Sequence, residues 1–348
     1  MIAITGGGTG GHLNIVKCLL ESANKLNIEC IYIGSQNGQD KAWFENEEKF
    51  KYKYFLPSSG VMNKNILNKI ISLFNILKLS FKSKKILKNH KIKAVFSVGG
   101  YSAAAGSFGA IFSNIPLFIH EQNSKIGNLN KILKPFSKIF FSAFEENYCS
   151  YPIRKEFFEK ARIRKNIKNI IFLGGSQGAS FINNLALKLA PILNKKNIKI
   201  IHQCGKKELD FYQNSYKNMG LNVDCFDFVN NIEEKFFKAD LAISRSGASS
   251  LFELCANLLP AIFIPYPSAV KNHQFFNAKF LYDKKLCEIF MQDNKNIIND
   301  IINTINNIDI NNISKELNNI TKPNGADFMI YQALKSLDFN NTPSSLNS

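Results

Sequence analysis

A short apolar run followed by a glycine-rich or small-residue segment occurs four times in this chain. The segments are residues 6–11 ("GGGTGG"), 99–106 ("GGYSAAAG"), 174–178 ("GGSQG") and 246–250 ("SGASS"). Because strands that alternate with helices are typical of a parallel, doubly wound sheet, we predict an α/β fold. Ligands of such folds bind at the carboxyl ends of the strands, where these loops are expected to lie.

The strand–helix pattern stops and restarts near residue 150. The segment "CSYPIRKEF" (149–157) carries a proline and a cluster of charge, and "KNIIFLGGSQGASFINNLAL" (168–187) then repeats strand, glycine turn and helix. A length of 348 residues suits two domains of ordinary size. We predict two Rossmann-like doubly wound parallel-sheet domains facing a cleft, over residues 1–153 and 154–325, with a terminal helix and tail over 326–348 that could pack back on the first domain.

The composition of the chain limits the kinds of partner and site that we expect. The formal charge is +17, which predicts attraction to nucleic acid, an acidic lipid surface or a phosphorylated ligand. The seven cysteines are scattered and form no C-x-x-C pair, so we expect reduced thiols rather than disulfides or a zinc site. No signal-peptide pattern and no run of 18 apolar residues occurs, so we expect no membrane span.

The first glycine loop matches the dinucleotide-binding pattern G-x-G-x-x-G at Gly6, Gly8 and Gly11. An NAD-linked enzyme would also carry an acidic residue at the end of the second strand, but Ser35 stands there and Asp40 lies well into the loop. No G-K-[ST] follows the glycines either. The loops therefore favour another phosphate-bearing ligand, bound at the positive N-terminal ends of helices.

Six segments in order closely resemble the MurG family of GT-B glycosyltransferases over about residues 1–337: "GGGTGGH", "GGYSAAAG", "HEQN", "GGSQGA", "SRSGASSLFE" and "HQFFNA". The resemblance implies an inverting transfer of N-acetylglucosamine from UDP-N-acetylglucosamine to the C4 hydroxyl of lipid I, giving lipid II in peptidoglycan synthesis. It also implies that no metal or other cofactor is needed, and the chain contains no D-x-D motif. Two alternatives are an epimerase of the same fold acting on UDP-N-acetylglucosamine, and a basic non-enzymatic protein that binds membranes or nucleic acid.

The resemblance assigns donor-binding roles in the second domain. Glu253 would hold the ribose hydroxyls, although a carboxylate in a first helical turn also complements the helix dipole without binding anything. Arg154 would neutralise the departing UDP. The remaining donor-side positions are Ser176 for the diphosphate, Val229 for the uracil, Gln274 for the sugar hydroxyls, and Ala248, Ser249, Ser250, Leu251 and Phe252 along the nucleotide.

The first domain is expected to present the acceptor. Thr9, Gly10 and Gly11 would approach the donor from the other side, with Asn123 near the donor sugar. The loops that contain Gly8, Gly99, Gly100, Tyr101 and Ser102 suit the diphosphate of the acceptor.

An inverting transfer needs a base for the attacking hydroxyl, and His12 is the first candidate. Two other interpretations stay open for His12: it orients the acceptor without taking the proton, or it caps or packs on the first helical turn. Glu121 is a second candidate in the acceptor site, whereas we expect His120 to be a core histidine with satisfied hydrogen bonds. The family usually has proline where this chain has Ile15, which concerns the rigidity of the loop more than its chemistry.

Residues 64–93 contain nine lysines and no acidic residue, interleaved with large apolar residues. Much of this apolar surface is expected to be core against the sheet, with the lysines solvated, but a basic amphipathic stretch also suits an anionic membrane surface. The resemblance favours the membrane, because lipid I is anchored in the cytoplasmic leaflet. It implies a peripheral protein on the cytoplasmic face of the bacterial inner membrane. Its partners would be UDP-N-acetylglucosamine, undecaprenyl-linked lipid I and the anionic lipid surface, but no nucleic acid.

Overall fold

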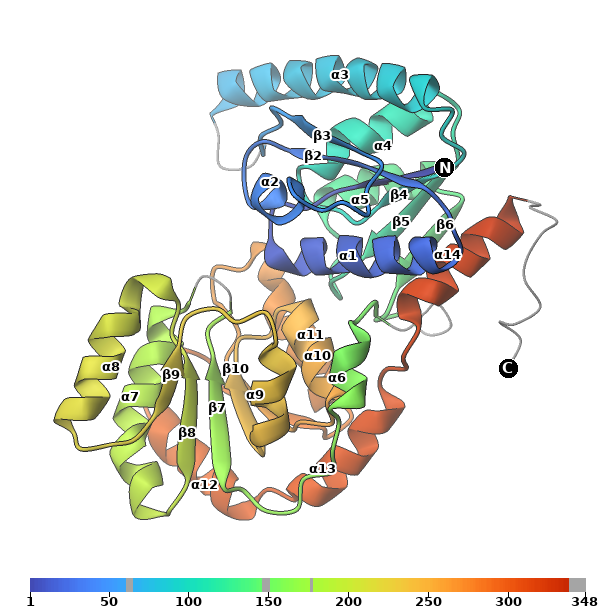
Figure 1. Cartoon of the computed structure of the whole chain (residues 1–348). Coiled ribbons are helices and arrows are strands. Elements are labelled where there is room, and N and C mark those ends of the chain that lie inside the picture. Colours follow the sequence, from blue (N-terminus) through green and yellow to red (C-terminus); the bar gives the residue numbers. More distant parts are fainter. Residues whose placement is uncertain (61–64, 146–150, 176–177, 338–348) are drawn as a thin grey trace. The chain divides into compact units, whose positions relative to one another are not determined.

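The computed structural model describes residues 1–60, 65–145, 151–175 and 178–337. The chain divides into two compact units, one of Met1–Gln122, Ile126–Ile153 and Asn324–Ser348, the other of Asn123–Lys125 and Arg154–Pro323. The chain thus passes to the second unit between Ile153 and Arg154, and its C-terminal segment returns to the first unit. Figure 1 shows a sheet flanked by helices in each unit.

The first unit is built on a parallel sheet in the strand order β3-β2-β1-β4-β5-β6. Its strand β1 is buried along its whole length, as expected for the centre of a sheet covered on both faces. The strands are β1 (Ile2–Thr5), β2 (Cys30–Ser35), β3 (Tyr52–Leu56), β4 (Val95–Ser97), β5 (Leu117–Glu121) and β6 (Ile139–Ser142).

Helices of the first unit connect these strands, and the C-terminal helix α14 lies against α1. Lys25 at the end of α1 pairs with Asp327 of α14 at 3.2 Å, which ties the two helices at their surface. The helices are α1 (Gly10–Lys25), α2 (Asp40–Phe44), α3 (Ile66–Asn89), α4 (Ala103–Ile111), α5 (Asn128–Leu133), the 3-10 turn η1 (Lys134–Phe136) and α14 (Gly325–Ser336).

The second unit repeats the arrangement with the strand order β12-β11-β10-β7-β8-β9, all parallel. Its strands are β7 (Asn169–Leu173), β8 (Lys199–Gln203), β9 (Asp224–Phe226), β10 (Leu241–Ser244), β11 (Ala261–Phe263) and β12 (Cys287–Ile289). Its helices are α6 (Lys155–Glu159), α7 (Ser180–Lys195), η2 (Lys206–Glu208), α8 (Leu209–Asn218), α9 (Ile232–Lys238), α10 (Ala248–Ala256), η3 (Val270–Asn272), α11 (His273–Tyr282), α12 (Ile297–Asn307), α13 (Ile310–Glu316) and η4 (Leu317–Asn319). Two doubly wound parallel sheets were predicted, and this prediction is confirmed.

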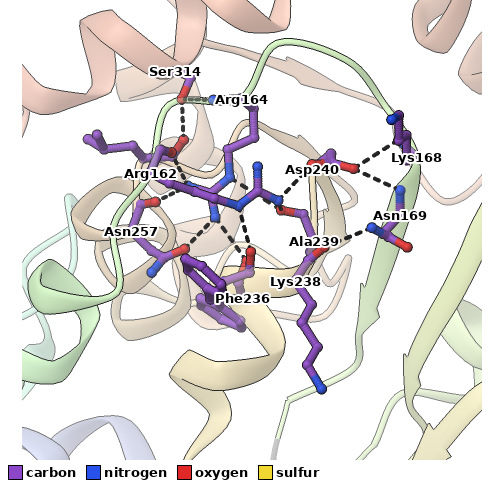
Figure 2. A network of polar contacts seen from close by, with 12 residues as sticks. Arg162, Arg164, Lys168, Asn169, Phe236, Lys238, Ala239, Asp240, Asn257 and Ser314 are labelled. Carbon is purple, nitrogen blue, oxygen red and sulfur yellow. Dashed lines mark hydrogen bonds and ion pairs between the residues drawn. The ribbon is translucent and has the colours of Figure 1, made fainter.

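The side chain of Arg164 is fully buried in the second unit, where it lies in a network of polar contacts (Figure 2). It donates to the carbonyl oxygens of Phe236 and Ala239 at the end of α9, and to the side-chain oxygen of Asn257 at the end of α10. Carbonyl groups at the last turn of a helix lack intrahelical donors and carry partial negative charge. Arg164 also donates to the backbone carbonyl of Asn257, so one cation contacts the C-terminal ends of both helices. The predicted donor-site residues Val229 and 248–253 lie before α9 and in the first part of α10. Burial lowers the pKa of Arg164 to about 9.

Candidate active site

His12 lies in the first turn of α1, directly after the first glycine loop. Its Nδ1 is 2.9 Å from the hydroxyl oxygen of Thr9, the N-cap residue, and 3.4 Å from Nε2 of Gln122. When Nδ1 carries the proton and donates it to Thr9, Nε2 keeps its lone pair and can accept a proton from a substrate. The Thr9 hydroxyl can accept from Nδ1 in this tautomer, whereas the side-chain amide of Gln122 donates to Nδ1 in the other one.

The loops 6–11 and 99–102 meet around His12. The Gly7 amide donates to the Gly99 carbonyl at 3.3 Å. Gly100 has a φ of +76°, and a Cβ at this residue would lie only 2.4 Å from the Gly7 carbonyl oxygen, so a side chain has no room there. A Cβ at Gly99 would lie 3.4 Å from Nε2 of His12. Two segments far apart in the sequence are thus brought to one place beside the imidazole.

The remaining residues predicted for the acceptor diphosphate differ in what their groups already contact. The Gly8 amide donates to Asp40, a residue to which the sequence pattern assigned no role. The ring of Tyr101 covers Gly8, and its hydroxyl donates to the Asn37 carbonyl at 2.7 Å. Ser102 precedes α4 and is buried, and its hydroxyl oxygen has no hydrogen-bond partner among the described residues. Because this hydroxyl is buried, a contact of Ser102 with the acceptor diphosphate stays a prediction.

Glu121 ends β5 and is 3% exposed. Its Oε2 accepts hydrogen bonds from the Gly127 amide at 2.8 Å and from the side-chain amide of Asn130 at 3.0 Å. Gly127 is the N-cap of α5, so the carboxylate holds the start of that helix. This geometry supports a role of Glu121 in shaping the loop after β5, and its place in the acceptor site stays a prediction.

His120 is buried, as expected, but it is not a satisfied core histidine. Neither ring nitrogen has a hydrogen-bond partner among the residues that the structure describes, and the ring packs edge-on to Tyr151 at 5.4 Å. Burial, with a smaller contribution from nearby His12, lowers the pKa of His120 to about 3. The expectation of a hydrogen-bonded histidine is wrong, because the ring lies buried beside the ring of Tyr151 and the described residues offer its nitrogens no partner.

A pH dependence of stability follows from this neutral histidine. Between pH 6.5 and about 3 the unfolded chain binds a proton at His120 that the folded chain does not, so the free energy of unfolding falls as the pH falls. The expected loss is about 1.4 kcal/mol per pH unit for this group. Urea unfolding of the wild type and of His120→Phe from pH 6.5 to 4.5 should show a shallower decline for the variant. Equal slopes would contradict the assignment.

The predicted donor segment of the second unit lies at the start of α10. Gly247 is the N-cap, and its carbonyl accepts from the Leu251 amide at 2.9 Å, so the helix begins as the sequence indicated. The side chains of Leu251 and Phe252 are fully buried. These two residues can therefore reach a nucleotide only through their backbone, whereas Ser249 and Ser250 are partly exposed.

Glu253 lies on α10, with Arg154 and Glu233 close enough to affect its charge. Burial, assisted by Glu233 and opposed by Arg154, raises the pKa of Glu253 to about 7. Such a carboxyl group gains from hydrogen-bond donors that stabilise its ionised form, and ribose hydroxyls are donors of that kind. The contact of Glu253 with the ribose stays a prediction.

Arg154 is already paired in this unit. Its guanidinium donates to the Glu233 carboxylate at 2.8 Å and to the Asn230 carbonyl at 3.2 Å. Glu233 is buried in the first turn of α9, and the sequence reasoning missed it. The acidic pair in "NNIEEKFF" indicates only the start of a helix. Nothing in the local sequence shows that Arg154, 79 residues earlier, faces Glu233.

Asn123 belongs to the second unit, not to the first as predicted. Asn277 of α11 explains this: its side-chain amide donates to Asn123 at 3.2 Å and to the Ser246 carbonyl at 3.1 Å. The oxygen of the same amide accepts from the backbone and the hydroxyl of Ser124. One buried asparagine thus connects the segment 123–125 to the end of β10.

Three further donor positions have different outcomes. Gln274 lies in the first turn of α11, and its side-chain oxygen accepts from the Tyr266 amide at 2.9 Å. Val229 is partly buried in the turn between β9 and α9. Ser176 lies outside the described residues.

Comparison with known proteins agrees with the fold and the motifs. The family model described as the glycosyltransferase family 28 N-terminal domain matches residues 2–142, and the model of the C-terminal domain matches residues 169–329. The chain belongs to glycosyltransferase family 28. The resemblance predicted from six short segments is thereby confirmed.

Relatives of this family 28 chain cover nearly its full length. The UDP-N-acetylglucosamine--N-acetylmuramyl-(pentapeptide) pyrophosphoryl-undecaprenol N-acetylglucosamine transferase of Campylobacter jejuni (strain RM1221) is 63% identical over 333 residues, 96% of this chain and 97% of the relative. The transferase of the same name from Wolinella succinogenes is 51% identical over 84% of this chain and 88% of its own length. The crystal structure of Acinetobacter baumannii MurG superimposes with a TM-score of 0.77 at 26% identity, covering 96% of this chain and 99% of that one.

Proposed function

We propose that this protein transfers N-acetylglucosamine from UDP-N-acetylglucosamine to the C4 hydroxyl of the muramyl sugar of lipid I, producing lipid II. The observation that carries the proposal is the 63% identity, over 96% of the chain, to a transferase named for this reaction. The same identity disfavours the epimerase and the non-enzymatic alternatives. The geometry of each unit supports the assignment of individual residues.

In the proposed reaction the first unit holds the acceptor. As the attacking C4 oxygen approaches the anomeric carbon, its proton passes to Nε2 of His12, while Nδ1 stays bonded to Thr9. The new C1–O4 bond forms on the face opposite the breaking bond to UDP, so the configuration inverts. The amides of the first turn of α1 are suited to the acceptor diphosphate.

The second unit holds the donor in this proposal. Glu253 accepts hydrogen bonds from the ribose, and the start of α10 offers positive dipole charge to the diphosphate. Arg154, released from or shared with Glu233, offsets the charge of the departing UDP. We propose that this charge stabilisation makes a metal ion unnecessary, in keeping with the lack of a D-x-D motif in the sequence.

The decisive experiment uses UDP-N-acetylglucosamine labelled in the sugar, a lipid I analogue and the whole chain. Label is expected in the lipid product at an unchanged rate with EDTA present. Free N-acetylglucosamine or an epimerised sugar nucleotide without labelled lipid would refute the transfer. A rate restored only by added divalent cations would refute the metal-independent part alone.

Helix α3 supplies the strongest structural argument for a membrane surface. Its contact with α4 includes small residues: Ser80 and Ser83 are buried, and both lie against Gly109 of α4. Seven large apolar residues in the first two thirds of the helix are instead exposed, although Phe81 among them stacks on Phe112 at 5.4 Å. This α3 apolar face consists of Leu67, Ile70, Ile71, Leu73, Phe74, Leu77 and Phe81, with exposures from 44% to 72%.

The expectation that much of this apolar surface is core is met by Leu79, Ile86 and Leu87, which are buried, but it is wrong for the α3 apolar face. Exposed lysines, among them Lys69, Lys78 and Lys82, lie on the same helix. No helix of the described residues is long and apolar enough to span a bilayer. We propose that the α3 apolar face and its lysines dock on the anionic cytoplasmic face of the inner membrane.

Vesicle binding tests this docking. Phe74→Ser together with Phe81→Ser should weaken binding to vesicles containing 30% phosphatidylglycerol by roughly 10–100-fold, because two aromatic side chains no longer enter the lipid. Phe211→Ser, which removes an exposed phenylalanine of α8 in the second unit, is the matched control. Sedimentation with sucrose-loaded vesicles gives the partition constants. Equal binding of the double variant and the control would overturn the docking proposal.

A further inference from the structure

The carboxylate of Asp40 lies fully buried behind the first glycine loop. Its Oδ2 accepts a hydrogen bond from the Gly8 amide at 2.7 Å, and its Oδ1 accepts one from the Ser35 amide at 3.2 Å. The Tyr32 hydroxyl lies 2.8 Å from Oδ1 and 2.8 Å from the Gly6 carbonyl oxygen. Asp40 thus connects both sides of the glycine loop to the end of β2.

The inner side of the loop has no space for anything but this carboxylate. A Cβ at Gly7 would lie 2.4 Å from Oδ1 of Asp40, and Gly8 has a φ of +83°. Glycine loops before a helix commonly offer their amides to a ligand phosphate. Here the Gly8 amide is bonded from within by a negative side chain, so a phosphate at Gly8 would find the donor in use and a like charge next to it.

We propose that Asp40 is a positioning residue that takes the place of a ligand anion at Gly8 and holds the loop in the shape that carries Thr9 and His12. The acceptor diphosphate then binds to the later amides of the α1 first turn and to the 99–102 loop, not to Gly8. The effect on catalysis rests on the proposed function, whereas the effect on the loop does not.

An isosteric substitution separates this role from simple packing. Asparagine at residue 40 keeps the size of aspartate but has one accepting oxygen, so it must turn its NH₂ group toward either the Gly8 amide or the Ser35 amide. One buried N–H then lacks an acceptor, and the loop loses its anchor on that side. Tyr32→Phe removes only the hydroxyl and leaves both amide contacts in place, which makes it a milder second variant.

The first readout is hydrogen exchange of peptides covering residues 6–12, followed by mass spectrometry. Asp40→Asn should speed exchange there by roughly tenfold or more, Tyr32→Phe by about threefold, and the exposed Asp293→Asn of the second unit not at all. The second readout is transfer to the lipid I analogue. Asp40→Asn should lower kcat/KM for the acceptor by roughly 10–100-fold, with the Kd for UDP-N-acetylglucosamine within twofold of the wild type.

Several results would overturn the proposal. Unchanged exchange in residues 6–12, or faster exchange across both units alike, would show that Asp40 does not position this loop. Faster local exchange with unchanged acceptor kinetics would remove its catalytic relevance. If Asp40→Asn does not fold, Asp40→Ser is measured in its place, and unchanged exchange in residues 6–12 of that variant would refute the proposal. A wild type that transfers no sugar refutes the proposed function instead, and the exchange comparison still tests the loop.

Discussion

Replacing His12 by alanine is expected to lower kcat for transfer to the lipid I analogue by roughly 10²–10⁴-fold. The reason is the proposed role of the imidazole as a base: when Nδ1 carries its proton and donates it to Thr9 at 2.9 Å, Nε2 receives the proton of the attacking hydroxyl. Steady-state kinetics at saturating donor and acceptor measure the effect, and a pH profile of kcat should lose its acidic limb in the variant.

His12→Asn distinguishes the three interpretations of this residue. The asparagine side chain can keep a hydrogen bond to Thr9 but cannot act as a base at neutral pH. If His12 is the base, the asparagine variant should be nearly as slow as the alanine variant. A large recovery of kcat in His12→Asn would assign to His12 the orientation of the acceptor. Unchanged kcat in both variants, with lower melting temperatures, would leave His12 a capping or packing role.

The second large effect is expected at Glu253. Removal of its carboxylate in Glu253→Ala should weaken binding of UDP-N-acetylglucosamine by about 1–3 kcal/mol, or roughly 5–150-fold, because two ribose hydroxyls lose a charged acceptor. Isothermal titration calorimetry gives the Kd. The exposed Glu316→Gln in the same unit should bind as the wild type does.

The pKa of Glu253 predicts the direction in which donor affinity changes with pH. Its pKa in the free protein is about 7, so between pH 8 and pH 6 the carboxyl takes up a proton and the better acceptor is lost. Donor affinity should therefore fall as the pH falls in the wild type, and this decline should be absent in Glu253→Gln. If Glu253 serves only the helix dipole, both variants will bind the donor normally and lose about 0.3–1 kcal/mol of stability.

Local patterns predicted much of the fold and part of the site. Periodicity placed strands and helices where β1, α1, β7 and α7 are found, because each carries its own pattern of apolar residues and a glycine turn. Thr9 and His12 are three residues apart on one turn, so their contact is a local matter. The start of α10 at Ala248 follows in the same way from the small residues after β10.

Contacts between distant segments were not predictable in this way. The pairing of Arg154 with Glu233 and the connection of Asn123 to Asn277 join residues 79 and 154 positions apart. Nothing in the local sequence shows that α3 turns Ser80 and Ser83 toward α4 and leaves Phe74 exposed, since both faces carry residues able to pack. Asp40 looked like a misplaced acidic partner of a dinucleotide loop, and in the folded unit it bonds to that loop from behind.

By itself, the sequence determined the order of strands and helices, the two parallel sheets, the family and the identity of the candidate base, because these depend on near neighbours and on short motifs. Tertiary structure alone decided which polar groups are already satisfied and which remain for a ligand. It paired the Gly8 amide with Asp40, left the Ser102 hydroxyl and the His120 ring without partners among the described residues, and exposed the α3 apolar face. The physical reason is that hydrogen bonding and burial depend on how the whole chain packs. The type of a residue determines only which contacts its side chain is able to make.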